Sequence, residues 1–255
     1  MLGDIYNLIL YQPLFNILIL FYQYLPGKDF GVAIILLTVS IRLITYPLMA
    51  KSIKSQKILS ELQPKIQEVQ QKFKNDKQAQ AREVMALYKK EKINPFGGFL
   101  PLLIQLPILF ALYGVFWKGL QPGQMSQLYS FVPHPLAIDP TFLVIFNLAQ
   151  PSIILAVLAG ICQFIQTKMM TPSLRSGQAI KNKDQMSQFS NIMQKQMLYL
   201  FPLFTVFILW KMPSAIGLYW VVTSLFSIGQ QYLIMKPLTK IKFGSGQEQH
   251  GTAKY

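Results

Sequence analysis

The sequence has few charged residues. Only 13% of its 255 residues are Asp, Glu, Lys or Arg, whereas 52% are hydrophobic and the mean hydropathy is +0.33. Soluble globular domains carry roughly 25% charged residues. This scarcity argues against a soluble protein and favours one that lies in a membrane.

Acidic residues are the scarcest charged group. The chain has 10 Asp and Glu against 24 Lys and Arg, which gives a formal net charge of +14 at pH 7. Such an excess suits anionic partners, either nucleic acid or acidic lipid. A basic nucleic-acid-binding protein spreads its charges through soluble structure, whereas long stretches here hold none. We therefore expect a lipid bilayer as partner and no sequence-specific nucleic acid.

Cysteine and histidine are also rare. The one cysteine, Cys162, excludes an intramolecular disulfide and a metal site built from cysteines. The two histidines, His134 and His250, are far apart in the sequence, which argues against a histidine-based metal site or nucleophile. The sequence thus predicts no metal, no cofactor and no enzymatic activity.

Long apolar stretches are abundant instead. A membrane-spanning helix needs about 20 predominantly apolar residues. Five stretches without Asp or Glu meet this need, and we expect spans at 30–49, 97–118, 152–170, 196–211 and 214–235. A sixth stretch, Ile5–Tyr24, mixes polar residues and Pro13 with many aromatic rings. That composition favours an interfacial helix within residues 1–29 over a sixth span.

The positive charges fall mainly on one side of these spans. Twenty Lys and Arg lie in residues 50–96, 168–195 and 236–255, and three lie on the other side, at Lys28, Lys118 and Lys211. Cytoplasmic loops retain positive charge. We therefore expect segments 50–96 and 171–195 and the tail 236–255 in the cytoplasm, and the loop 119–151 outside. No secretory signal or transit segment is evident, so the simplest location is a bacterial cytoplasmic membrane.

The first cytoplasmic segment predicts a helical hairpin. Apolar residues recur every three or four positions from Leu59 to Phe73, and again from Ala81 to Tyr88, with a polar break at 74–77 between them. Pro64 suits a helix start better than a helix interior, so we expect a joint in the first arm there. Segment 171–195 has little apolar periodicity and predicts a loop.

One charge lies inside a predicted span. Arg42 is about seven residues from the cytoplasmic end, or roughly 10 Å at 1.5 Å per residue. No span contains an acid that could neutralise it, and an arginine near mid-helix costs about 2.5 to 3.5 kcal/mol on insertion scales. Thr38 shares its helical face, and other spans carry Gln105, Gln163, Gln166 and a stripe through Trp220 and Ser227.

Three interpretations of this polar group stay open at the level of sequence. Arg42 can snorkel to the cytoplasmic interface. The polar side chains can join helices through hydrogen bonds. Together they can also line a water-containing groove that is open to the cytoplasm, which is the interpretation we favour, because several spans contribute to one cation.

Seven motifs then resemble a known family in the same order along residues 12–240. They are Gln12-Pro13-Leu14-Phe15, Thr38 through Arg42 to Tyr46-Pro47-Leu48, Leu62–Gln67, Met85–Lys89, Asn94–Gly98, Pro101–Gln105, and Pro213-Ser214-Ala215 with Leu218-Tyr219. The chain resembles a minimal bacterial member of the YidC-type membrane protein insertases. The resemblance implies an all-α membrane protein with five spans, a preceding interfacial amphipathic helix and a cytoplasmic helical hairpin between the first two spans.

The resemblance also implies a site and partners. Arg42 matches the arginine of the family's groove, and Thr38 matches its neighbour one turn earlier. The other matching positions are Gln105, Gln166, Tyr219 and Trp220, of which Tyr219 and Trp220 fall where substrate contacts occur in relatives. The implied partners are nascent membrane proteins, a Sec-type translocon, the signal recognition machinery and the ribosome.

A function from another class fits the lone arginine as well. A secondary transporter or anion pathway would use Arg42 as the counter-ion of its substrate. It would also show intramembrane carboxylates or repeated halves with broken helices, and the sequence shows neither. Purified protein in liposomes separates the two functions, since one inserts a membrane protein and the other passes an ion or solute.

The charge distribution predicts the topology. After replacement of Cys162, single cysteines at Ser55, Ser130 and Ser187 are treated in intact cells with a membrane-impermeant thiol reagent. We expect labelling at position 130 alone, because the twenty-to-three charge split places 50–96 and 171–195 inside. Labelling at position 55 before the cells are opened would contradict this topology.

Overall fold

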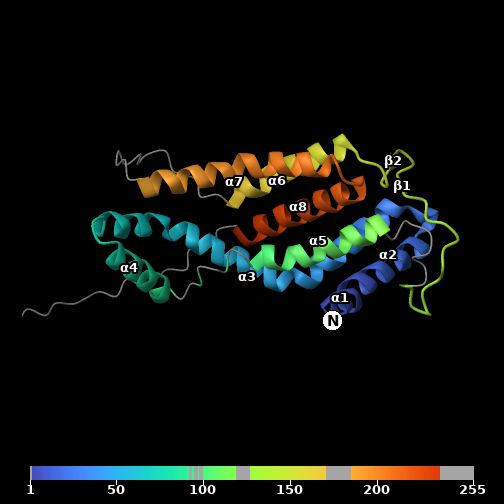
Figure 1. The fold of residues 1–255 in the computed structure, drawn as a ribbon, viewed down its shortest axis with the longest axis horizontal. Coiled ribbons are helices and arrows are strands. Elements are labelled where there is room, and N and C mark those ends of the chain that lie inside the picture. The colour runs from blue at the N-terminus through green and yellow to red at the C-terminus, as the bar shows by residue number, and fades with distance from the viewer. Residues whose placement is uncertain are drawn as a thin grey trace, which may run out of the picture.

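The computed structural model describes residues 2–91, 94, 97, 100–118, 127–170 and 185–235. The predicted tail 236–255, residues 171–184 of the predicted loop, and part of the 94–98 motif lie outside them. Helices make up most of the described chain, as the all-α prediction requires (Figure 1). In chain order they are α1 (Leu2–Tyr6), the π-helical turn η1 (Asn7–Tyr11), α2 (Gln12–Tyr24), the 3-10 turn η2 (Pro26–Lys28), α3 (Phe30–Lys72), α4 (Lys77–Lys90), α5 (Leu100–Lys118), α6 (Ile153–Met170), α7 (Gln185–Leu209) and α8 (Ser214–Met235).

Three described helical segments are long and apolar enough to cross a membrane. They are Gly3–Tyr24, α3 and α6, and two shorter apolar helical stretches are Leu103–Trp117 and Leu198–Leu209. These lengths are consistent with an all-α membrane protein, whereas the count of five spans stays a prediction. Since Gly3–Tyr24 is also long enough to span, its length does not decide between an interfacial and a spanning helix.

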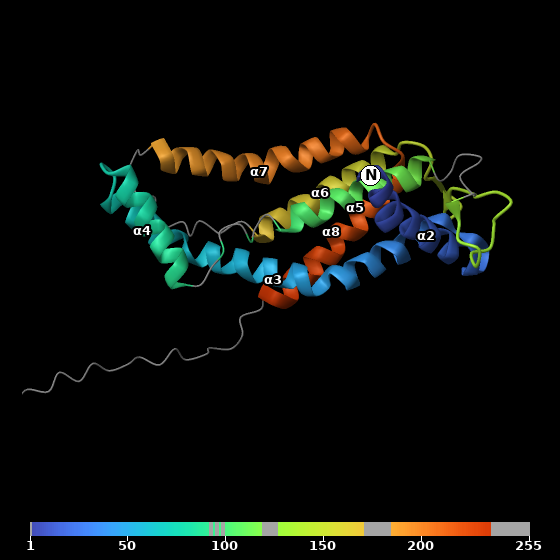
Figure 2. The ribbon, with the colours of Figure 1, turned by 60° about the horizontal axis from the view of Figure 1, so that its bottom comes forward.

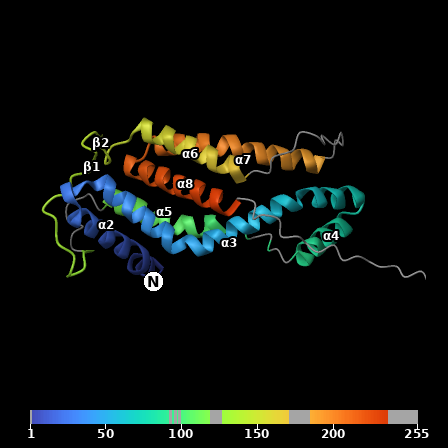
Figure 3. The same cartoon turned by 180° about the vertical axis from the view of Figure 1, so that it is seen from behind.

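Helix α3 differs from its prediction. The helix is continuous for 43 residues and contains both Pro47 and Pro64, so the joint expected at Pro64 is wrong. Leu62 and Ile66, which flank Pro64, are both buried, and α4 folds back beside the end of α3 (Figure 3). Tertiary packing on both sides of the proline stabilises the helix against the lost backbone hydrogen bond.

The end of the long helix α3 and the helix α4 form a helical hairpin. Asp76 caps α4 by accepting hydrogen bonds from the backbone N–H groups of Gln78 and Ala79, each at 3.0 Å. Across the turn, the buried Gln80 donates to the carbonyl of Gln70 at 2.9 Å. The hairpin projects from one end of the molecule (Figure 2). Its existence agrees with the predicted pair of helical stripes, and its cytoplasmic location stays a prediction.

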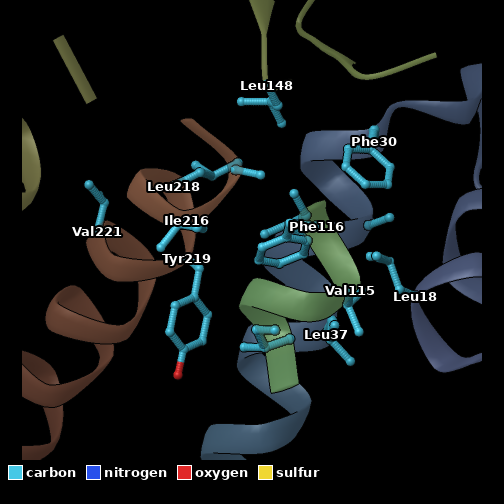
Figure 4. Packing of buried hydrophobic residues seen from close by; sticks show 14 of the residues in the cluster. Leu18, Phe30, Leu37, Val115, Phe116, Leu148, Ile216, Leu218, Tyr219 and Val221 are labelled. Carbon is cyan, nitrogen blue, oxygen red and sulfur yellow. The ribbon is translucent and has the colours of Figure 1, made fainter. Parts of the chain in front are cut away.

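Helix α8 lies centrally in the bundle. It packs between α3 and α6, while α7 packs on the outer side of α6 (Figures 1 and 2). On the other side, α2 packs against α3 and α5. Figure 4 shows the shared core of these helices, in which Leu18, Leu37, Phe116 and Ile216 come from α2, α3, α5 and α8 respectively.

Helix α7 is longer than predicted. It begins at Gln185, so residues 185–195 belong to a helix and not to the predicted loop 171–195. The sequence from 185 to 195 contains neither Pro nor Gly, and its apolar residues Met186, Phe189 and Met193 are three and four positions apart. This spacing is that of an amphipathic helix, so the extension of α7 was present in the sequence and was missed because the whole segment 171–195 was treated as one loop.

The chain between α5 and α6 contains an element that the sequence analysis missed. Two short antiparallel strands, β1 (Thr141–Phe142) and β2 (Phe146–Asn147), pair Thr141 with Asn147 and Phe142 with Phe146. The loop is fastened to three helices. Asn16 of α2 accepts from the N–H of Tyr129 at 2.6 Å, Asp29 before α3 accepts from that of Leu143, and Ala215 of α8 donates to the carbonyl of Leu148 at 3.1 Å.

The contact between α6 and α7 leads to a prediction about stability. A Cβ atom at Gly160 of α6 would lie 2.3 Å from Cγ2 of Val206 and 3.3 Å from the carbonyl oxygen of Pro202. We expect Gly160→Ala to lower the free energy of unfolding by about 1 to 3 kcal/mol, because it overpacks this contact. Val206→Ala in the same chain should restore much of the loss.

Gly229→Ala is the matched control. A Cβ atom there meets nothing within 4 Å, so the substitution should leave stability unchanged or raise it by up to about 1 kcal/mol through helix propensity. The measurement is thermal unfolding of the purified protein in one detergent. Equal melting temperatures for both alanine variants would contradict the close approach of α6 and α7.

Candidate functional site

Arg42 lies between α3 and α8. Its side chain is buried, with only 7% of the residue exposed. The guanidinium donates to the hydroxyl oxygen of Ser227 and, at 3.5 Å, to the carbonyl oxygen of Thr223. Its Cζ atom also lies 5.6 Å from the centre of the Phe226 ring. Three residues within little more than one turn of α8 thus contact the cation of α3.

All of these partners are electrically neutral. The sequence holds no Asp or Glu from Phe30 to Ser60, and none from Leu100 to Met235 except Asp139 and Asp184. Within the described structure, Arg42 Nε has no hydrogen-bond partner. A hydroxyl, a carbonyl and an aromatic face stabilise a guanidinium without cancelling its charge. The site therefore keeps a net positive charge and an unused polar atom.

Thr38 is buried one turn before Arg42. Its hydroxyl donates to the carbonyl oxygen of Ile34 at 2.6 Å, within its own helix. Thr45, one turn after Arg42, donates in the same way to Ile41 at 2.8 Å. These local bonds use the hydroxyl protons and leave oxygen lone pairs on the face that carries Arg42.

A second polar contact joins Gln105 of α5 to Tyr219 of α8. The Gln105 side chain of α5 donates to the Tyr219 hydroxyl, and Tyr219 is 1% exposed. Tyr219, Thr223 and Ser227 are spaced by four residues and therefore share one face of α8. This face contacts Gln105 at its first member and Arg42 at its last two.

Trp220 joins α8 to α6. Its indole N–H donates to the side-chain oxygen of Gln163, which is buried. The resemblance pointed to Gln166 on α6, but the structure makes Gln163 the hydrogen-bond partner of Trp220 and leaves Gln166 half-buried one turn further on. The polar residues thus divide into one set near α3 and α5, and another near α6.

Sequence reasoning missed two residues of this region. Phe226 offers its ring to Arg42, yet an aromatic residue in an apolar span carries no signal of that role. Gln231 is 1% exposed, and its side-chain oxygen has no hydrogen-bond partner among the described residues. Its neighbour Gln230, part of the predicted stripe, donates to the carbonyl of Tyr46 at 3.2 Å.

The described residues could also form a metal site or a cavity. They contain no group of three His, Cys, Asp or Glu arranged to hold a metal ion. A cavity of about 320 Å³ lies near the start of α8, where Trp117, Phe207 and Lys211 are among its lining residues. Arg42 does not line it, so this cavity and the buried arginine are separate features.

The contact between Arg42 and Ser227 leads to a prediction. Ser227→Ala removes an acceptor from a buried cation, so we expect the free energy of unfolding to fall by about 1 to 3 kcal/mol. Ser224→Ala is the matched control, because Ser224 is equally buried on α8 and one turn from this contact. Thermal unfolding in detergent measures both. A larger loss for Ser224→Ala would show that the Ser227 contact contributes little.

Comparisons with known proteins agree with the resemblance. The family model described as 60Kd inner membrane protein matches residues 20–241. A relative from Fusobacterium nucleatum named membrane protein insertase YidC is 38% identical over 208 residues, which cover 82% of this chain and 87% of the relative. A relative of the same name from Clostridium tetani is 40% identical over 211 residues, which cover 83% of this chain and 84% of the relative.

Longer relatives match as well. One from Geotalea uraniireducens, also named membrane protein insertase YidC, is 36% identical over 229 residues, which cover 89% of this chain but 37% of the relative. The similarity thus includes all of the helices that carry Arg42, Gln105, Gln163 and Trp220. The chain therefore belongs to the family of the 60Kd inner membrane protein, which includes the YidC membrane protein insertases.

Proposed function

We propose that this protein is a non-enzymatic insertase and chaperone that carries nascent membrane proteins into the bilayer. Family membership supports insertion as the general function. The observation that supports the mechanism is Arg42, a buried cation whose contacts on α8 are all neutral. In this proposal, Arg42 lies in a hydrophilic groove that is open to the cytoplasm.

The groove would accept the polar part of a substrate. A short hydrophilic tail must cross an apolar layer, and its charges make that crossing costly. A fixed guanidinium attracts acidic residues of the tail, and the polar atoms around it hold water. The apolar segment of the substrate then moves sideways into lipid, where its transfer is favourable. No covalent bond has to form or break.

The other proposed groove residues have supporting roles. Thr38 presents a hydroxyl oxygen one turn from Arg42. Tyr219 supplies a hydroxyl on the face of α8 that contacts Arg42, and Gln105 of α5 donates to that hydroxyl. Trp220 and Gln166 would contact the substrate on the side of α6. The buried side-chain oxygen of Gln231 adds unused hydrogen-bonding capacity, which suits a site that binds water or varied peptide groups.

The positively charged hairpin would receive substrates. The eleven Lys and Arg of residues 50–96 suit anionic surfaces such as lipid headgroups and ribosomal RNA. We propose that it lies in the cytoplasm and meets the ribosome, the signal recognition machinery or a Sec-type translocon. The associated location is a bacterial cytoplasmic membrane, with five spans and a cytoplasmic C-terminus.

The central prediction concerns the charge of Arg42. In liposomes that contain only this protein, Arg42→Ala should reduce insertion of single-span substrates with acidic translocated tails more than that of substrates with neutral tails, because the attraction is electrostatic. Arg42→Lys should retain part of the activity, since the charge remains although the planar fork is lost. The measurement is protease protection of the tail over a substrate series that differs only in tail charge.

Ser227→Ala is the control for this experiment. It removes one contact of the guanidinium but keeps the charge, so it should preserve the preference for acidic tails even if the protein becomes less stable. Equal insertion of all substrates by the parent protein and Arg42→Ala would refute the electrostatic mechanism. Loss of insertion for neutral and acidic tails alike would assign Arg42 to stability of the bundle.

A further inference from the structure

The turn between β1 and β2 exposes three consecutive apolar residues. Leu143, Val144 and Ile145, which we call the apolar tip, have exposed fractions of 57%, 93% and 78%. No charged residue occurs from Pro140 to Thr167. Single exposed apolar residues are common on proteins, but a contiguous apolar projection indicates contact with a partner or a membrane.

The backbone of the apolar tip is also unusual. The N–H of Ile145 donates to the carbonyl of Phe142 at 3.1 Å, which closes a β-turn inside the three-residue hairpin loop 143–145, since Phe142 pairs with Phe146. Both central residues have positive φ, +50° at Leu143 and +63° at Val144. Such turns strongly prefer Asn-Gly, and a β-branched residue is disfavoured there. The sequence thus keeps two large apolar side chains where the backbone and an aqueous environment both favour Asn-Gly.

Hydrogen bonds hold the β1–β2 hairpin, and with it the apolar tip, beside the first residues of α3 and α8. Leu143 donates its N–H to Asp29 at 2.7 Å, and Asp29 is the residue that caps α3. The ring of Phe142 lies against Gly31, where an added Cβ atom would come within 2.1 Å of Cδ2. The other strand is held by Ser214 at the start of α8, whose hydroxyl donates to the carbonyl of Asn147 at 3.2 Å.

The position of the apolar tip beside these helix starts indicates its depth in a membrane. The start of an apolar spanning helix lies near the boundary between headgroups and acyl chains. The hairpin β1–β2 is at this end of the bundle, opposite α4 (Figures 1 and 3). Seven residues, 146–152, separate the apolar tip from the exposed Ile153 and Ile154, which begin α6, a helix long and apolar enough to span a membrane. The apolar tip therefore lies close in the chain to the start of a candidate span.

We propose that the apolar tip inserts into the interfacial layer of the adjacent leaflet and binds phospholipid there. Transfer of the three side chains from water to acyl chains offsets the unfavourable turn conformation. Because the same hairpin bonds to the start of α3 and of α8, this anchor holds the two helices that enclose Arg42 at a fixed depth in the bilayer.

The test measures depth directly. With Cys162 replaced by Ala, single cysteines at Val144, Ser130 and Ile161 carry nitroxide labels in purified full-length protein in phospholipid nanodiscs. Position 130 serves as the reference in water and position 161, exposed in the middle of α6, as the reference in lipid. We expect collisions with a water-soluble nickel complex to be several-fold rarer at 144 than at 130, and collisions with oxygen to be more frequent.

A second variant keeps the turn but removes its apolar character. Leu143→Asn with Val144→Gly supplies the preferred turn residues, so the protein should fold at least as well. A label at Ile145 should then become several-fold more accessible to the nickel complex than the same label beside Leu143 and Val144. Unchanged accessibility would overturn the proposal, because the two apolar side chains would not determine the depth.

Two further outcomes also overturn it. If position 144 is as accessible as position 130 in nanodiscs, the apolar tip lies in water. If it is accessible in nanodiscs but protected in native membranes, the tip binds a partner protein and not lipid. Protection in nanodiscs made of lipid and this chain alone, lost in the Asn-Gly variant, supports the lipid anchor.

Discussion

The contact between Arg42 and α8 is the constraint around which the bundle is organised. A cation inside an apolar layer must find polar atoms, and no span offers a carboxylate. Helix α8 supplies a hydroxyl, a carbonyl and an aromatic ring over little more than one turn. This requirement fixes both the separation of α3 from α8 and the rotation of α8 about its axis, because only one face carries Thr223 and Ser227.

The same rotation of α8 sets the remaining polar contacts. With Ser227 turned toward α3, Tyr219 reaches Gln105 of α5, and the adjacent Trp220 reaches Gln163 of α6. Hydrogen bonds between membrane helices are individually modest. They are directional, however, so they select one arrangement among several that bury similar apolar area. Small residues complete the packing, and Gly160 allows α7 to approach α6 closely.

The neutral partners of Arg42 matter both for the packing of the helices and for the proposed function. A carboxylate beside Arg42 would cancel its charge and reduce its attraction for the acidic substrate tails that we propose it binds. Hydroxyl, carbonyl and ring partners hold the guanidinium and leave the charge in place. At the other end of α3 and α8, the loop that contains β1 and β2 joins the two helices through Asp29 and Ser214. A lipid-bound apolar tip there would set the depth of the proposed groove.

The sequence by itself determined the properties that depend on composition and local spacing. Apolar length predicted the helices around Leu100–Lys118, Ile153–Met170 and Ser214–Met235, and the motifs identified the family. The absence of acids from the spans marked Arg42 as unusual. Only the tertiary structure decided which neutral groups contact it, that Trp220 bonds to Gln163, and that α3 continues through Pro64. Those features depend on how each helix is rotated about its axis and on packing between residues far apart in the chain. The spacing of apolar residues within one segment determines neither of these.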